Sequence, residues 1–232
     1  MPAVPIPRRG LAGLIIAVLL TAGCQRLDET GEAISRADLV NDLASRLSRS
    51  SQLTYTAGYR LSEGRSGSIT QAPPSTLYGY PGGTLTVRRD AVVECVTDRR
   101  PTTCTVDVPP ARGSSVSTTV LAPAQRQGMI TPPLAVSLLT AAALDPNATI
   151  GQTDTTVAGR HATCVAVRQL SNAPTVSFDL CVTTEGVLGS FTGVVDGVSV
   201  DLALSQLRDA ADRTAFDLPT GARVTDRRPA DK

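Results

Sequence analysis

A succession of short β-type segments, separated by very short turns, limits the fold of this sequence more than any other feature. One series occupies residues 53–108 and a second occupies residues 149–204. Both are rich in Val, Thr and Leu, and Gly, Pro, Asp or Asn stands at most of the breaks. A parallel connection needs about a dozen residues, so turns this short make consecutive strands antiparallel neighbours. The sequence therefore predicts one large antiparallel sheet.

Alternation and turn residues place the individual strands. Every second residue from Leu53 to Leu61 is apolar or aromatic, as in a half-buried strand. Asp196-Gly197 is a strong hairpin signal in the second series. The expected strands are 53–61, 68–71, 76–80, 84–88, 91–97, 102–108, 149–157, 162–168, 176–182, 187–194 and 198–204.

Two further segments carry helical patterns. Residues 35–49 have leucines at every fourth position, and a second apolar segment begins at Thr131-Pro132 and ends at Asp145-Pro146. Residues 109–128 have no regular pattern, and loops of that length are usually functional or disordered. The sequence thus predicts an α+β domain. A sheet this large must curl, so we expect a half-barrel with the two main helices packed on its concave side.

Four of the cysteines form two symmetric pairs. Cys95 and Cys104 flank a turn at 98–101, and Cys164 and Cys181 flank a turn at 171–174. Residues opposed across a hairpin come within disulfide range, so we predict two hairpin disulfides, 95–104 and 164–181. The alternative is a metal site that combines cysteines with His161, but its spacing matches no standard zinc pattern. We therefore predict no metal and no other cofactor.

The first residues have the pattern of an export signal. Arg8 and Arg9 precede an apolar run at 11–20, and small residues then lead to Cys24. This ending resembles the lipobox of bacterial lipoproteins, whose cysteine is acylated with fatty acids such as palmitate and becomes the first residue of the mature chain. The resemblance implies a signal peptide at 1–23 and a lipid anchor at Cys24 on the extracytoplasmic face of the cell membrane. In the alternative interpretation the signal peptide is simply cleaved and Cys24 is incidental.

The remaining chain divides into three parts. Residues 24–33 lack a periodic apolar pattern and form a tether, 34–225 form a single domain, and 226–232 form a disordered tail. The formal net charge of +1 gives no basic footprint, so we expect no nucleic acid among the partners.

The sequence offers little catalytic chemistry. Lysine occurs once, at Lys232, and histidine once, at His161. Neither a Gly-rich phosphate loop nor a Gly-x-Ser-x-Gly nucleophile elbow is present. A Ser-His-Asp triad would need His161, which its hairpin position exposes to water, and nothing brings two carboxylates together. We therefore predict no catalytic residue and a protein that is not an enzyme.

The order of the elements resembles a known fold. The pieces are a helix before 53–57, the turn at 186–188, the hairpin at 196–197, and Ala215-Phe216-Asp217-Leu218-Pro219. They are similar to the half-barrel of periplasmic lipoprotein carriers and cell-envelope lipoproteins of the LppX, LprG and RseB kind, over residues 31–225. The resemblance implies an apolar concavity, covered by helices, that holds acylated ligands or peptides. Candidate cavity residues, equally suited to an ordinary core, are Tyr55, Tyr59, Phe178 and Phe191.

Two functions follow from these observations. The first is a membrane-anchored, non-enzymatic carrier of an apolar, lipid-like ligand. The second is a structural or regulatory envelope protein that binds a protein partner and fills the concavity with its own side chains. An apolar void of at least several hundred Å³ favours the carrier, whereas a packed interior favours the second function.

Overall fold

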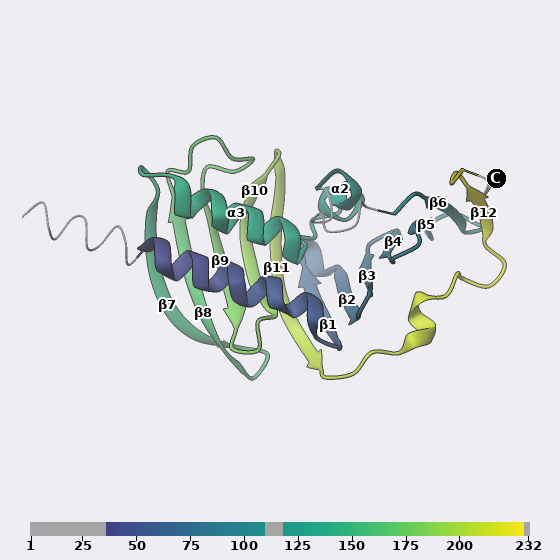
Figure 1. Cartoon of the computed structure of the whole chain (residues 1–232), viewed down its shortest axis with the longest axis horizontal. Coiled ribbons are helices and arrows are strands. Elements are labelled where there is room, and N and C mark those ends of the chain that lie inside the picture. The colour runs from purple at the N-terminus through teal and green to yellow at the C-terminus, as the bar shows by residue number, and fades with distance from the viewer. Residues whose placement is uncertain (1–35, 110–117, 230–232) are drawn as a thin grey trace, which may run out of the picture.

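A single 12-stranded sheet organises the computed structural model, which describes residues 36–109 and 118–229 (Figure 1). The strand order is β12-β6-β5-β4-β3-β2-β1-β11-β10-β9-β8-β7. The strands are β1 (Tyr55–Leu61), β2 (Ser66–Ala72), β3 (Ser75–Tyr80), β4 (Gly83–Val87), β5 (Val92–Val96), β6 (Thr103–Asp107), β7 (Thr149–Val157), β8 (Arg160–Arg168), β9 (Phe178–Thr183), β10 (Leu188–Val195), β11 (Val198–Arg208) and β12 (Arg223–Asp226).

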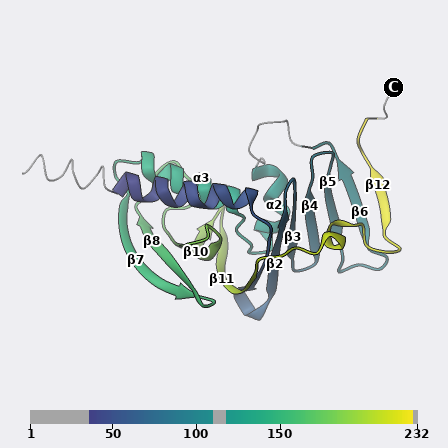
Figure 2. The same cartoon turned by 60° about the horizontal axis from the view of Figure 1, so that its bottom comes forward.

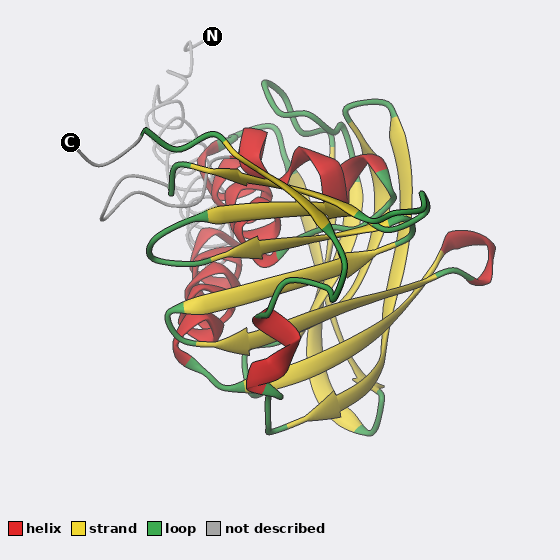
Figure 3. Cartoon of the chain, turned by 90° about the vertical axis from the view of Figure 1, so that its right-hand side faces the viewer, coloured by secondary structure: helices red, strands yellow, loops and turns green. Residues whose placement is uncertain are grey.

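Two meanders build this sheet. Strands β1 to β6 follow one another as antiparallel neighbours, and so do β7 to β11. Antiparallel pairing of β1 with β11 joins the meanders, and β7 and β12 form the two edges. The sheet curls without closing (Figures 2 and 3). The expected α+β class with a curled sheet is therefore confirmed.

The helices divide the sheet into two halves. The N-terminal helix (residues 36–49) and α3 (Pro132–Leu144) lie side by side across the concave face of β7 to β11 (Figures 1 and 2). The shorter α2 (Thr118–Arg126) lies against β3 and β4. We call β7–β11 the covered half, and β1–β6 with β12 the open half. Three 3-10 turns complete the described elements: η1 (Ser50–Gln52), η2 (Ser62–Gly64) and η3 (Arg213–Phe216).

The local sequence explains why α3 begins and ends where it does. Thr131 is extended, and Pro132 and Pro133 occupy the first helical positions, where a missing backbone N–H loses no intrahelical bond. The helix stops at Asp145, whose N–H donates to the carbonyl of Ala141. Apolar residues lie on most of its circumference, so α3 can pack against both the sheet and the neighbouring helix.

The main core lies between the helices and the concave face of the sheet. Leu43 and Leu47 from the N-terminal helix and Leu138 from α3 are buried in the same cluster as Phe178 and Phe191 from the sheet. Burial of each such side chain contributes about 1.5–3 kcal/mol. The helix pair is therefore held to the sheet mainly by apolar contact.

A second, smaller core lies on the convex face of the open half. Val92 belongs to the main core and its neighbour Val93 to the smaller one, because successive side chains of a strand point to opposite faces. The C-terminal segment crosses the strands of the open half from β11 to β12, on the side that faces the viewer in Figure 2, and Ala222 packs against this core. The members of the smaller core are Ala91, Val93, Cys95, Cys104 and Val106.

Two elements differ from the sequence predictions. Helix α2 lies within residues 109–128, for which the sequence predicts no regular pattern, because Pro123 interrupts an otherwise short apolar repeat. Strand β12 is exposed throughout and shows no alternation, and the predicted disordered tail at 226–232 begins at its last residue. Since β12 pairs parallel with β6, the prediction of a wholly antiparallel sheet is wrong at this edge.

Candidate functional site

Side chains fill most of the concave face of the covered half, and a cavity of about 240 Å³ lies beside β7. Phe178 and Phe191 stack with their ring centroids 5.6 Å apart, and both are buried. Tyr59 is buried as well, and its hydroxyl donates a hydrogen bond of 3.0 Å to the carbonyl oxygen of Leu188. The structure thus places these three candidate cavity residues in the main core. The open half contains two cavities, described below, and none of the three residues lines either of them.

Tyr55, the fourth candidate, lines a cavity of about 340 Å³ in the open half. We call it the apolar cavity. It lies between the end of the N-terminal helix, the start of α3 and strands β1 to β3. Its volume is at the low end of the range of about 300–1,000 Å³ found for small-molecule sites. The apolar and aromatic lining residues are Leu47, Tyr55, Ile69, Tyr78, Pro132, Pro133 and Val136.

Polar groups gather on one side of the apolar cavity and are largely bonded to each other. The Gln71 side-chain amide donates to the backbone carbonyl of Ser51 at 3.0 Å and accepts from the Thr76 hydroxyl at 2.7 Å. The Ser50 hydroxyl donates to the carbonyl of Leu47 at 2.7 Å. This network ties η1 to β2 and β3, so one wall of the cavity is fixed by hydrogen bonds rather than by packing alone.

Burial around the apolar cavity favours neutral phenols. It raises the pKa of Tyr55 to about 12, with a hydrogen bond to Ser50 acting in the opposite direction. Burial also raises the pKa of Tyr78 far above its ordinary value, with a smaller contribution from Tyr55. The two tyrosines therefore present neutral, hydrogen-bonding hydroxyl groups within a mainly apolar lining.

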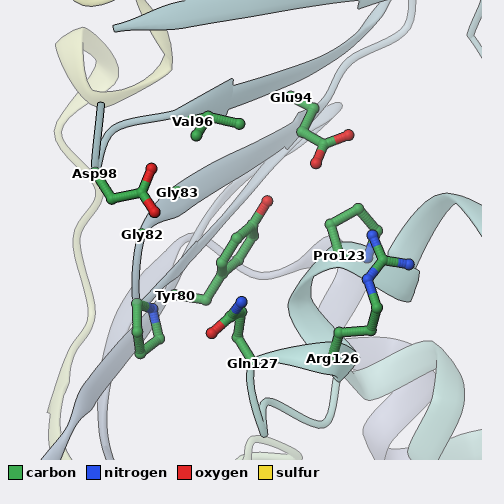
Figure 4. Close-up of a pocket in the computed structure, with 10 residues that line it drawn as sticks. Tyr80, Gly82, Gly83, Glu94, Val96, Asp98, Pro123, Arg126 and Gln127 are labelled. Atoms are coloured by element: carbon green, nitrogen blue, oxygen red, sulfur yellow. The ribbon is translucent and has the colours of Figure 1, made fainter. Parts of the chain in front are cut away.

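A second cavity, which we call the polar cavity, has a volume of about 390 Å³ and lies between α2 and strands β3 to β5 (Figure 4). Glu94 comes from β5 and Asp98 from the turn after it. Arg126 comes from the end of α2, and the Tyr80 ring lies between these charged side chains. Burial and then the charge of Glu94 raise the pKa of Tyr80, and Arg126 opposes this shift. The polar cavity is thus lined by charges of both signs.

The cysteines pair as the sequence predicts. Cys95 bonds to Cys104 between β5 and β6, and Cys164 bonds to Cys181 between β8 and β9. These disulfides indicate an oxidising, extracytoplasmic location. His161 is exposed on β8, and no cluster of potential metal ligands occurs within 36–109 and 118–229.

The predicted lipid anchor lies outside the described residues, because the structure describes nothing before residue 36. Signal peptide 1–23, Cys24 and the tether 24–33 therefore stay predictions. Among the helices that the structure does describe, none has the length and apolar character of a membrane span.

Sequence reasoning did not identify the residues contributed by β3 and α2. Tyr78 and Tyr80 face the two cavities from one strand, and their alternation with Gly79 is the same signal that identified Tyr55 and Tyr59. No comparable signal marks Arg126, because its position depends on a helix that the sequence did not predict.

The fold defines the class of an α+β half-barrel, and its apolar and polar cavities lie in the open half. No protein-family model and no curated protein sequence matches the chain. Crystal structures of MucB, one of them in complex with MucA(peri), are similar at 15% and 16% identity, each with a TM-score of 0.44. The similarity covers 78% and 80% of this chain but only 63% and 61% of the MucB chains, so this chain spans about three fifths of their length.

An uncharacterized conserved protein from Thermus thermophilus is also similar, at 10% identity and a TM-score of 0.43. The similarity covers 81% of this chain and 98% of the Thermus chain. TM-scores and identities this low assign neither a family nor a partner to the protein.

Proposed function

We propose that this protein is an extracytoplasmic, lipid-anchored binding protein that takes one apolar chain, such as an acyl chain of a lipid, into the apolar cavity. The observation that carries the proposal is the mainly apolar lining of this cavity of about 340 Å³, which differs from the charged lining of the polar cavity. Its lining of Leu47, Ile69, Val136 and two neutral tyrosines favours an apolar ligand over a charged one.

The lining also predicts how an acyl ligand lies in the apolar cavity. Each methylene group moved from water into the cavity contributes about 0.8 kcal/mol, so an acyl chain gains affinity with every group that fits. The hydrogen-bonded side formed by Ser50, Gln71 and Thr76 offers polar atoms to a ligand head group. An amphiphile with a short polar end therefore fits this cavity better than a plain hydrocarbon.

Filling the cavity with a larger side chain tests the proposal. Val136 lines it from α3, so Val136→Trp is expected to weaken binding of laurate and palmitate at least about tenfold, which corresponds to about 1.4 kcal/mol. Binding is measured by native mass spectrometry of the delipidated protein and by displacement of a fluorescent fatty acid.

Val176→Trp is the matched control, because Val176 is 71% exposed and lies outside the apolar cavity. It is expected to bind both fatty acids as the unchanged protein does. Absence of fatty-acid uptake by the unchanged protein, or equal binding by Val136→Trp, contradicts the proposal.

The anchoring part of the proposal rests on the sequence around Cys24. Cys24→Ala is expected to move the protein from the membrane fraction to the soluble fraction of cells, and Cys24 is expected to incorporate labelled palmitate. Cys24→Ala protein that stays in the membrane fraction argues against a lipid anchor.

A second candidate function, binding of a protein partner, is favoured by the edge strand β7. This strand is 9 residues long, pairs with β8 without a register shift, and is exposed along most of its length. It has neither Lys nor Pro, and Asp154 is its single charged residue. Lys and Pro on an edge strand commonly prevent it from pairing with another chain. An edge strand without them can accept an added strand from a partner.

Photo-crosslinking separates this candidate from the first. A crosslinking residue at Thr153 is expected to give a discrete crosslinked protein in cells, and Thr156→Pro is expected to abolish it, because the register with β8 leaves the backbone N–H of Thr156 facing the free edge. The same crosslinker at Val224, on the opposite edge, is the control. A crosslink that survives Thr156→Pro excludes strand addition at β7.

A further inference from the structure

The polar cavity holds three charged side chains that have no ion-pair partner. Glu94, Asp98 and Arg126 line it, and none of them forms a salt bridge with another residue of 36–109 and 118–229. Several charged groups elsewhere on the surface do pair, as in Arg160 with Glu185 and Arg168 with Asp179. Unpaired charges of both signs in one concave site leave their attraction available to a ligand.

The backbone around Tyr80 keeps this cavity open. Tyr80 lies opposite Gly83 across the β3–β4 hairpin. A Cβ at Gly83 would lie 2.9 Å from the Tyr80 ring and 2.7 Å from the carbonyl oxygen of Cys95, so only glycine allows the ring to lie at this place. Gly82 has a φ of +83° and faces the Asp98 carboxylate, which fixes the turn beneath the cavity.

The charges lie on two sides of Tyr80. Glu94 from β5 and Arg126 from α2 lie on one side of the ring, and Asp98 from the turn after β5 lies on the other (Figure 4). The complementary ligand therefore carries two cationic groups and one anionic group, separated by a short apolar stem that lies along the Tyr80 ring. Aromatic rings also attract cations placed over their faces.

We propose that the polar cavity binds a basic α-amino acid, such as L-lysine, whose carboxylate pairs with Arg126 and whose two cationic groups pair with Glu94 and Asp98. This binding is separate from the acyl-chain proposal, because the two cavities share no lining residue. The volume of about 390 Å³ is within the range of small-molecule sites, about 300–1,000 Å³.

A ligand series that removes one charge at a time tests the proposal in the purified protein by isothermal titration calorimetry. Cadaverine lacks the carboxylate of lysine, ε-aminocaproate lacks the α-ammonium group, and norleucine lacks the side-chain ammonium group. Each is expected to bind at least about tenfold more weakly than L-lysine, since each loses one charge-assisted contact. Equal affinity for L-lysine and any of the three overturns the assignment of that charge.

Matched variants show whether the contacts are those proposed. Arg126→Gln is expected to lose the preference for L-lysine over cadaverine while cadaverine still binds. Glu94→Gln and Asp98→Asn are each expected to weaken L-lysine binding about tenfold or more. Unchanged lysine-to-cadaverine preference in Arg126→Gln overturns the proposal, as does the absence of L-lysine binding to the unchanged protein.

Control variants remove the same charges outside the cavity. Asp154→Asn on β7 and Arg208→Gln on β11 are expected to bind L-lysine as the unchanged protein does. If they weaken it as much as the cavity variants do, the effect comes from overall charge and the proposal fails. Because Glu94, Asp98 and Arg126 are at least partly exposed, their variants are expected to fold, which circular dichroism checks.

Discussion

The two halves of the sheet have the same kind of strands and differ in what covers them. Over β7 to β11, two helices pack leucines against Phe178 and Phe191, and a smaller cavity of about 240 Å³ lies between the start of the N-terminal helix, the end of α3 and β7. Over β1 to β6, the 9-residue α2 covers only part of the concave face, and the apolar and polar cavities are left in that half. The half-barrel thus has a large apolar core where two helices cover its concave face, and its two larger concave cavities where the cover is partial.

The first way to test this contrast is to shorten one side chain of α3 in each environment. Leu138 is fully buried under the covered half, so Leu138→Ala is expected to lower the free energy of unfolding by about 2–5 kcal/mol. Val136, two residues earlier, lines the apolar cavity, and Val136→Ala is expected to cost less than about 1 kcal/mol because it enlarges an existing space.

Urea unfolding followed by circular dichroism measures both values. Val is a weaker helix former than Leu, so Val136→Ala gains a few tenths of a kcal/mol more helix propensity than Leu138→Ala, which is less than the difference expected from packing. Equal losses of stability would mean that the apolar cavity is packed in solution, and the contrast between the halves would fail.

The disulfides give a second comparison, since each half contains one. Replacement of either pair by alanines is expected to cost about 2–3 kcal/mol, because both close short loops in the unfolded chain. Cys95 and Cys104 are also members of the small convex core, whereas Cys181 is only half-buried. We therefore expect the larger loss of stability for the double variant that combines Cys95→Ala with Cys104→Ala.

Urea midpoints of the two double variants, with the m-value checked for each, measure this order. A larger loss on removal of the 164–181 disulfide would mean that the covered half depends on its crosslink more than on its helices.

The tyrosines report on the same contrast through pH. The chain has four tyrosines and no tryptophan, and burial raises the pKa of all four, so phenolate absorbance is expected to show no group titrating near pH 10. For Tyr55 burial raises the pKa from 10.0 to about 12 on folding, which contributes on the order of 3 kcal/mol to the free energy of unfolding at neutral pH relative to high pH. That contribution is complete below pH 10 and is lost as the pH rises towards 12.

Tyr55→Phe separates this titration from the others. It removes the pH-dependent contribution of Tyr55, so the loss of stability between pH 10 and 12 is expected to be smaller than in the unchanged protein. Phenolate absorbance that rises by the amount of one tyrosine near pH 10 in the native state would contradict the burial of these rings.

The sequence predicts the parts of this fold that have strong local signals. The alternation around Tyr55 and Tyr59, the hairpins around the cysteines and the Pro132 helix start are all local, and the structure contains each element. Helix α2 contains Pro123 and few strong helix formers, so it depends on contacts with β3 and β4 that no local pattern shows. The polar cavity depends on α2, so the sequence did not predict this cavity either.

Which of four buried aromatic residues meets a cavity is also a tertiary property. Tyr55 and Tyr59 have the same spacing and share a strand face, yet only Tyr55 lines a cavity. The difference arises because Tyr59 lies deeper in the main core, with its hydroxyl on the carbonyl of Leu188. Alternation predicts the face of a strand and not what covers that face.

The smallest expected effect concerns the two edges of the sheet. Arg228 donates from its side chain and backbone to Asp226, which lowers the pKa of this exposed carboxyl to about 2. The contribution of this contact is complete at neutral pH and is lost as the pH falls from the ordinary value of 3.8 through about 2. Asp226→Asn is therefore expected to loosen the end of β12 without changing the thermal midpoint of the domain.

Hydrogen exchange at the amides of Arg223 and Arg227, which donate to the carbonyls of Thr102 and Val106, measures this loosening. Both amides are expected to exchange faster in Asp226→Asn and to be unchanged in Asp154→Asn on the opposite edge. Since β12 has only 4 exposed residues, its pairing with β6 depends on such polar contacts rather than on a core. A shift of the global midpoint by Asp226→Asn would instead show that β12 is an integral part of the open half, which would then be stabilised at its edge as well as at its centre.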